Sequence, residues 1–163
     1  MKERQDKRSI VGFRDRCRRA GLKVTPQREL VYRTLMETDA HPSAEWVYGR
    51  VRESMPNISF DTVNRTLLTL SGIGAAFIVE GSGESRRFDG NLASHQHFKC
   101  VRCKRILDFH YEPFDNIAVP EEVRKRFELL RTTVYLEGIC DRCRAAKGPS
   151  EKTSSNTTNI NPQ

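Results

Sequence analysis

Two pairs of cysteines constrain this chain more than any other feature. Cys100 and Cys103 form one Cys-x-x-Cys pair, and Cys140 and Cys143 form another further along the chain. Each pair places two thiolates on a tight turn, and two such pairs make the tetrahedral ligand set of a structural zinc site. A thioredoxin-type dithiol would instead need one pair at the start of a helix in a βαβ pattern, which is missing here. The sequence therefore predicts bound Zn²⁺ that staples the segments around both pairs.

A second group of metal-capable side chains surrounds the first cysteine pair. His95 and His97 lie two residues apart, so on an extended segment both imidazoles point to one face. Asp89 precedes them and Asp108 follows them, which offers a ligand set of nitrogen and oxygen only. Such a set suits Fe(II) or Mn(II) better than a thiolate site would. The spacing alone leaves an ordinary surface or core role for the histidines equally open.

The excess positive charge lies at the beginning of the chain. Residues 1–33 contain eleven Lys and Arg against four Asp and Glu, which gives a net charge of +7. The other 130 residues contain seventeen of each sign and balance to zero. Such a concentration attracts a polyanion such as DNA, although a solvated basic face has the same composition.

Composition predicts a soluble, cytoplasmic protein. Hydrophobic residues are 37% and charged residues 30% of the chain, and no run approaches the roughly 18 apolar residues of a membrane span. The basic N-terminus lacks the sustained apolar core of a secretory signal. We therefore expect the five cysteines in a reducing compartment, where paired Cys-x-x-Cys motifs favour metal over disulfides.

Apolar periodicity predicts four helices before residue 75. The first covers residues 10–20, ends at Gly21, and carries Cys17 on its apolar stripe, where we interpret it as a small buried hydrophobe. The next three begin after the N-caps Thr25, Ser43 and Ser59. Residues 76–80 and 86–89 flank a Gly-rich turn, as in a β-hairpin. The pattern predicts a winged helix-turn-helix over residues 1–90.

The fourth of these helices is the predicted DNA-recognition helix. Asn and Arg side chains can make paired hydrogen bonds to adenine and guanine edges, and both occur near its N-terminal end. A wing after the helix would bring arginines to the phosphates. On their own these residues are more typical of an ordinary solvated face. The candidate DNA contacts are Thr62, Asn64 and Arg65 on the helix, Arg19 in the basic first helix, and Arg86 in the wing.

A small α/β unit is predicted after a linker at residues 91–94. It covers residues 95–145, with strands near 97–101, 105–110 and 132–139 and a helix at 120–130 that turns Val123, Phe127 and Leu130 inward. The unit is too small to bury a generous core, so zinc would stabilise it and its apolar strand faces would suit a dimer. Residues 146–163, rich in Ser, Thr, Asn and Pro, are predicted to be a disordered tail. The fold class is therefore α+β.

Six segments of this chain, taken together, resemble the ferric uptake regulator (Fur) family. They are LKVTPQR at 22–28, AHPSA at 40–44, DTVNRTL at 61–67, RFD at 87–89, HQHFKCVRC at 95–103 and CDRC at 140–143. The resemblance covers about residues 10–145, in order and without large gaps. It implies a homodimer with an N-terminal winged helix and a C-terminal dimerisation domain. Such a protein would repress transcription from a double-stranded DNA operator when a sensed metal is bound.

Carried over position by position, the resemblance also implies a regulatory metal site. One ion would tie the two domains together across the linker, and the metal would favour the arrangement in which paired recognition helices match DNA spacing. The implied ligands are His41, Asp89, His95, His97 and Asp108.

Residues 106–111 are similar to the peroxide-sensing branch of the family, which has Asp where iron sensors usually have Glu. In that branch bound Fe(II) reacts with hydrogen peroxide and a ligand histidine is oxidised, and His41 and His95 are the matching positions. Two alternatives stay open: an iron-responsive repressor, and a zinc-ribbon metalloenzyme that uses the same histidines and aspartates for catalysis. Asn64 departs from the Tyr usual in the recognition helix, which leaves the operator sequence open.

Overall fold

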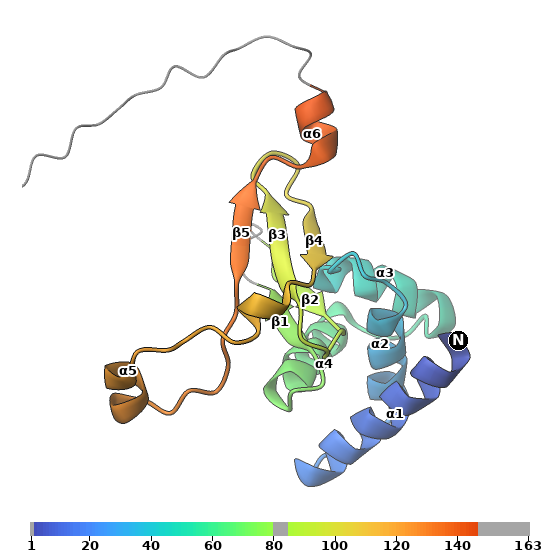
Figure 1. Cartoon of the computed structure of the whole chain (residues 1–163). Coiled ribbons are helices and arrows are strands. Elements are labelled where there is room, and N and C mark those ends of the chain that lie inside the picture. The colour runs from blue at the N-terminus through green and yellow to red at the C-terminus, as the bar shows by residue number, and fades with distance from the viewer. Residues whose placement is uncertain (1, 80–84, 147–163) are drawn as a thin grey trace, which may run out of the picture.

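The computed structural model describes residues 2–79 and 85–146, and it joins a helical front half to a back half built on a sheet (Figure 1). The front half contains helices α1 (Lys2–Arg19), α2 (Pro26–Met36), α3 (Ala44–Ser54) and α4 (Phe60–Gly72), followed by strands β1 (Phe77–Val79) and β2 (Arg87–Asp89). The back half contains β3 (Gln96–Cys100), β4 (Ile106–Phe109), the 3₁₀ helix η1 (Glu112–Phe114), α5 (Glu121–Arg126), β5 (Tyr135–Gly138) and α6 (Asp141–Ala145). The α+β class is as predicted. The predicted disordered tail, residues 146–163, lies outside the described residues except for residue 146.

The helix starts follow the capping residues that the sequence predicted. The side-chain oxygens of Thr25, Ser43 and Ser59 each accept a hydrogen bond from the backbone N–H three residues later. Helix α1 ends before Gly21, whose φ of +67° is the left-handed conformation that glycine adopts at a helix end. It begins at Lys2, well before the predicted start at residue 10, because Lys, Glu, Arg and Gln favour helix without showing an apolar period.

The hydrophobic core belongs to the front half. Sixteen buried residues between Ile10 and Phe88 form one cluster, and Val63, Leu67 and Leu70 on α4 are fully buried, as predicted. Cys17 is also fully buried in this cluster, and burial raises the pKa of its thiol. Its predicted role as a small buried hydrophobe is therefore confirmed.

The back half is a three-stranded sheet with little apolar core of its own. Strand β3 is central, antiparallel to β4 and parallel to β5. Among its described residues, the buried hydrophobic ones are Cys100, Ile106 and Cys140.

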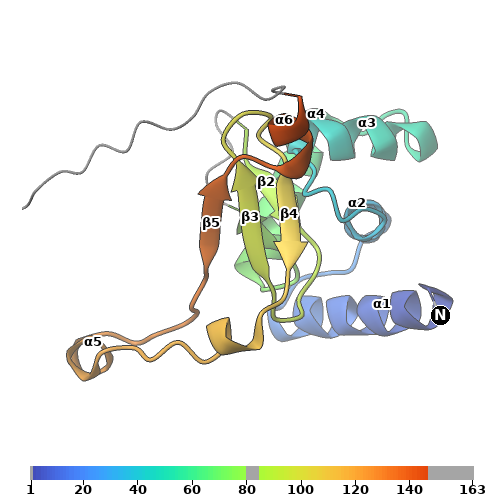
Figure 2. The ribbon, with the colours of Figure 1, turned by 45° about the horizontal axis from the view of Figure 1, so that its top comes forward.

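The prediction of an inward-facing helix at 120–130 is wrong. Helix α5 ends at Arg126 and lies apart from the sheet (Figures 1 and 2). Val123 is half-buried, whereas Phe127 and Leu130 are 59% and 88% exposed. The apolar surface of Phe127 and Leu130 stays exposed because α5 and the segment that follows it extend away from the sheet of their own chain (Figures 1 and 2).

The loop before α3 is fastened to strand β2. The backbone N–H of Phe88 donates to the carbonyl of Pro42 at 3.0 Å, and Ser43 pairs with Arg87 in an isolated β-bridge. Gly90 then lets the chain pass close to α2, since a Cβ there would meet the Met36 sulfur at 2.6 Å. These contacts fix where His41 and Asp89 lie.

Candidate metal centres

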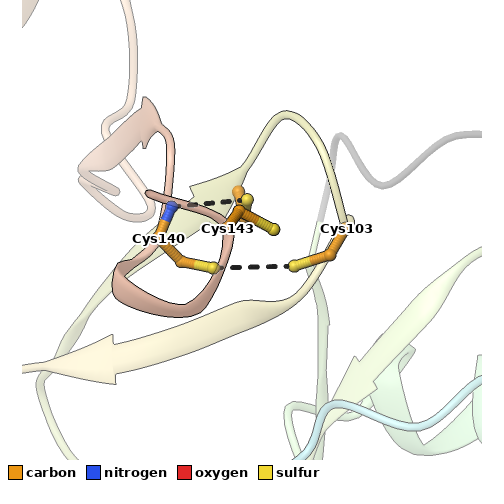
Figure 3. A group of neighbouring side chains, drawn as sticks. Cys103, Cys140 and Cys143 are labelled. Carbon is orange, nitrogen blue, oxygen red and sulfur yellow. Dashed lines mark hydrogen bonds between the residues drawn. The ribbon is translucent and has the colours of Figure 1, made fainter. Parts of the chain in front are cut away.

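Four cysteines gather where the ends of β3 and β5 meet. Cys100 ends β3, Cys103 follows in the turn, and Cys140 and Cys143 lie at the start of α6 and within it. The four sulfur atoms lie within 4.8 Å of one another. Figure 3 shows the Sγ atoms of Cys103 and Cys140 facing each other, 3.7 Å apart, and the Cys140 N–H donates to the Cys100 sulfur at 3.4 Å. The structure thus brings together all four predicted zinc ligands.

The ionisation of these thiols favours a bound cation. Hydrogen bonds from the backbone N–H groups of Cys140 and Cys103 lower the pKa of Cys100 to about 6. The pKa of Cys143 is instead raised to about 12 by the hydrogen bond its thiol shares with Cys103 and by burial. The Cys100 thiol therefore loses its proton more readily than the Cys143 thiol, and four thiolates at this spacing would need a divalent cation to balance their charge. The cluster fits Zn²⁺.

A second cluster contains nitrogen and oxygen ligands from both halves of the chain. Ligand atoms of His41, Asp89, His95 and His97 all lie within 4.8 Å of one another. The Nε2 atom of His95 is 2.9 Å from Asp89 Oδ2 and 3.1 Å from His97 Nε2. Asp108 Oδ1 lies 2.9 Å from His41 Nε2, 3.5 Å from His97 Nε2 and 3.8 Å from His95 Nε2. All five residues implied by the resemblance converge here.

The two ligand candidates from the front half, His41 and Asp89, are held in place by the backbone around them. His41 has a φ of +49° immediately before Pro42, a strained conformation for a residue with a side chain. The N–H of Asn91 donates to Asp89 Oδ1 at 2.7 Å, which leaves Oδ2 directed at the histidines. Burial pushes the pKa of Asp89 upward, but the nearby imidazole of His97 and the hydrogen bond from the Asn91 N–H hold that pKa below its usual value. The carboxylate is therefore anionic at neutral pH.

The back-half members are aligned by the sheet. His97 and Asp108 are direct partners in the β3–β4 register, so their side chains lie side by side on one face. His95 Nδ1 lies 2.8 Å from the carbonyl oxygen of Ala93, so Nδ1 carries the proton and donates it. The lone pair of Nε2 then points into the cluster, as metal-binding histidines require.

Several atoms in this cluster lack hydrogen bonds. Within the described part of the chain, His41 Nδ1 and Nε2, Asp89 Oδ2 and His97 Nδ1 are buried without a hydrogen-bond partner. The 2.9 Å approach of His41 Nε2 to Asp108 therefore lacks hydrogen-bond angles. An unpaired buried polar atom costs about 1–3 kcal/mol. A cation bound between Nε2 and Oδ2 would remove part of that cost, and the sulfur-free ligand set fits Fe(II) or Mn(II).

The candidate DNA contacts lie mostly on the surface. Thr62 and Arg65 are exposed on α4 and Asn64 is half-buried. Arg65 is held by Asp61 through an ion pair of 2.9 Å. Arg19 is exposed at the end of α1, and Arg86 is exposed just before β2.

The backbone groups that orient the ligands were missed by sequence reasoning. The N–H of Asn91 and the carbonyl of Ala93 fix Asp89 and His95 respectively. Backbone groups have no side-chain signature, so no pattern of residue types could reveal them.

Residues 19–137 match the model of the ferric uptake regulator family. The chain belongs to the ferric uptake regulator family. It is 32% identical over 127 residues to the peroxide-responsive repressor PerR of Staphylococcus epidermidis. The aligned region covers 78% of this chain and 85% of that protein. It is similar to the solved ferric uptake regulator Fur of Helicobacter pylori, with a TM-score of 0.69, 25% identity, and coverage of 89% of this chain and 96% of that one. The peroxide stress regulator of Campylobacter jejuni shares the fold, with a TM-score of 0.59, 24% identity, and coverage of 72% and 89%.

Family membership decides between the classes of function. Members of the ferric uptake regulator family are dimeric, DNA-binding transcriptional regulators that depend on metal, which rules out the zinc-ribbon metalloenzyme. No helix within residues 2–79 or 85–146 is long and apolar enough to cross a membrane.

Proposed function

We propose that this member of the family is a peroxide-responsive repressor that senses through its nitrogen and oxygen centre. The observation that carries the proposal is the convergence of three imidazoles and two carboxylates, without sulfur, from both halves of the chain. The S. epidermidis relative is named a peroxide-responsive repressor, which supports peroxide as the signal. Fe(II) or Mn(II) would occupy this centre, and Zn²⁺ would occupy the four-cysteine centre as a structural ion.

The switch follows from where the ligands originate. His41 and Asp89 belong to the front half, and His95, His97 and Asp108 belong to the back half. A single ion therefore favours the arrangement in which the two halves are held together. We assign residues 1–90 to DNA binding, 91–94 to the linker and 95–145 to dimerisation, so metal binding would set the spacing of paired recognition helices.

The exposed apolar residues of the back half support dimerisation through that half. A single chain leaves this surface in water, whereas a second copy would bury it. The residues are Val101, Tyr111, Ile117, Phe127, Leu129, Leu130, Leu136 and Ile139.

DNA binding would be divided between α4 and basic residues elsewhere in the front half. Thr62, Asn64 and Arg65 would reach base edges in the major groove, with Arg65 oriented by Asp61. Arg19 and Arg86 would contact phosphates, and the net charge of +7 in residues 1–33 would attract the duplex. Such a regulator acts in the cytoplasm, where its operator lies.

The peroxide reaction would modify a ligand of the centre. Fe(II) held by these five residues would supply the redox chemistry that cleaves the O–O bond of hydrogen peroxide beside the imidazoles, without net consumption of iron electrons. In the net reaction a ring C–H of His41 or His95 gains one oxygen atom and loses two electrons, while peroxide is reduced and its other oxygen leaves as water. Oxidation weakens the imidazole as a ligand, so the ion that joins the two halves is released and repression ends.

The test is peptide mass spectrometry of zinc-loaded protein after exposure to hydrogen peroxide with Fe(II) or Mn(II) bound. Trypsin releases residues 88–99, a peptide with His95 and His97 but no Met, Trp or Cys. Residues 34–50 contain His41 together with Met36 and Trp46, so there the oxidised residue must be located by fragmentation. We expect a gain of one oxygen at His95 or His41 with Fe(II) and no gain with Mn(II). Unmodified histidines together with iron-dependent operator binding would identify an iron sensor instead.

A further inference from the structure

A cluster of hydrogen bonds centred on Asp115 holds the residues that flank His95. Asp115 Oδ1 accepts hydrogen bonds from Ser94 Oγ at 2.6 Å and from Gln96 Nε2 at 2.9 Å. Its other oxygen, Oδ2, is 2.9 Å from His110 Nε2. We call Ser94, Gln96, His110 and Asp115 the Asp115 clamp. One carboxylate thus joins the end of the linker, strand β3, the end of β4 and the turn after η1.

Gln96 connects the clamp to the metal centre. It lies between His95 and His97 on β3, and adjacent side chains of a strand point to opposite faces, so Gln96 faces away from the ligands. Gln96 is 3% exposed, and its amide is bound at both ends, because Gln96 Oε1 accepts from the Tyr111 N–H at 2.8 Å. A slip of one residue would turn both imidazoles away from Asp89 and place Gln96 there instead.

The negative charge of Asp115 strengthens the hydrogen bonds of the clamp. Hydrogen bonds from Ser94 and His110 hold the pKa of Asp115 below its usual value, so the carboxylate is charged at neutral pH. Hydrogen bonds to a charged acceptor are stronger than neutral ones. Ser94 and Gln96 are therefore held on both sides of His95, while the Ala93 carbonyl orients its ring.

We propose that Asp115 is a positioning residue for the regulatory metal, which holds His95 and His97 in metal-binding geometry through the backbone of residues 94–97. The proposal rests on the regulatory site of the proposed function. Groups that hydrogen-bond directly to a metal ligand typically contribute about 10- to 100-fold to affinity, and Asp115, which acts through the neighbours of the ligands, should reach the lower end of that range. The clamp supplies that orientation from the face of the sheet opposite the ion.

The test measures Mn²⁺ affinity in the zinc-loaded dimer. Asp115→Ala removes both acceptor oxygens, and we expect Mn²⁺ affinity to fall about 10-fold while zinc content stays unchanged. Asp115→Asn keeps one oxygen for Ser94 and Gln96, so it should recover most of that loss. Glu112→Ala is the matched control, since Glu112 is an exposed acidic residue of neighbouring η1 and lies outside the clamp. It should leave the affinity unchanged.

Spectroscopy separates positioning from general destabilisation. Co²⁺ bound at saturation in place of Mn²⁺ should show altered absorption bands in Asp115→Ala and wild-type bands in Glu112→Ala. Mn²⁺ affinity within twofold of wild type in Asp115→Ala, or an equal loss in Glu112→Ala, overturns the proposal. If Asp115→Ala fails to fold, Ser94→Ala and Gln96→Leu replace it, because each removes hydrogen bonds of the clamp. Unchanged Mn²⁺ affinity in both variants would also overturn the proposal.

A variant of His95 separates failure of this proposal from failure of the proposed function. If His95→Ala binds Mn²⁺ as tightly as wild type, the regulatory site itself is wrong. If His95→Ala loses Mn²⁺ while Asp115→Ala keeps it, only the clamp is wrong.

Discussion

The two metal centres of this protein share strand β3 but differ in which parts of the chain they join. All four sulfur ligands come from the back half, between Cys100 and Cys143. The nitrogen and oxygen centre takes ligands from both halves, since His41 and Asp89 lie before the linker. Under the proposed function, loss of the ion from the first centre would unfold the back half, whereas loss from the second would release the front half from the back half. In this proposal, the origin of the ligands distinguishes the structural centre from the sensory one more than their chemistry does.

The two halves also differ in how much apolar core stabilises each of them. The front half has a continuous apolar core that includes Phe13, Leu67 and Phe88. Among the described residues of the back half, the buried hydrophobic ones are Ile106 and two of the zinc-candidate cysteines. The front half should therefore fold without metal, and the back half should not.

The largest effect should come from breaking the sulfur centre. Cys140→Ser removes one of four ligands, and binding of structural zinc contributes about 10–16 kcal/mol of apparent free energy to folding in small zinc domains. We expect the variant to lose stoichiometric zinc and the dimer, while the helices of the front half stay folded. Zinc analysis, sedimentation and circular dichroism measure these outcomes, with Cys17→Ala as a zinc-retaining control. A stable zinc-free dimer would contradict the structural role.

An intermediate effect should come from breaking the nitrogen and oxygen centre. His95→Ala removes one imidazole, and we expect Mn²⁺ affinity to fall at least about 100-fold, equivalent to about 2.7 kcal/mol. Zinc content and the dimer should be unchanged, and metal-dependent operator binding should be lost. Glu112→Ala keeps all five ligand candidates and the whole Asp115 clamp, so it is the control. Metal-dependent operator binding that persists in His95→Ala would count against the assignment.

The smallest effect should come from the ion pairs that join α1 to α2. Glu29 binds Arg14 and Arg33, each at 2.9 Å, and these hydrogen bonds lower its pKa. A pKa lowered by folding adds stability above the unfolded pKa, ~4.3 for glutamate, and that stability is lost as pH falls through the folded value. Glu29→Gln should cost at most about 1 kcal/mol at neutral pH, because the arginines are half exposed. Denaturant unfolding at neutral and acidic pH measures the difference, which should vanish in acid; a constant difference would refute an ionic origin.

The sequence was sufficient to predict where helices α2, α3 and α4 begin and which residues form the two metal-binding clusters. Thr25, Ser43 and Ser59 mark helix starts because capping is a local interaction of each residue with the next turn. The cysteine pairs were identifiable because zinc demands a fixed ligand type and spacing. His41 is different: it lies far from His95 in sequence, and only the family resemblance connected the two.

The misses share a physical cause, which is that they depend on what lies across space from a residue. Phe127 and Leu130 have the apolar spacing of a buried helix face, but their own chain leaves them exposed. Asp115 belongs to no motif, and it joins Ser94 and Gln96 only because the turn after β4 folds back along β3. The left-handed backbone of His41 likewise follows from the pairing of its loop with β2.

The most direct test of this comparison is anomalous diffraction from crystals of the zinc-loaded protein with Mn²⁺ bound. Data at the zinc edge should place one ion among the sulfurs of Cys100, Cys103, Cys140 and Cys143. Data at the manganese edge should place one ion bound by His41 and Asp89 together with His95, His97 and Asp108. Manganese bound by back-half residues alone, with His41 and Asp89 turned away, would contradict the claim that one ion joins the two halves.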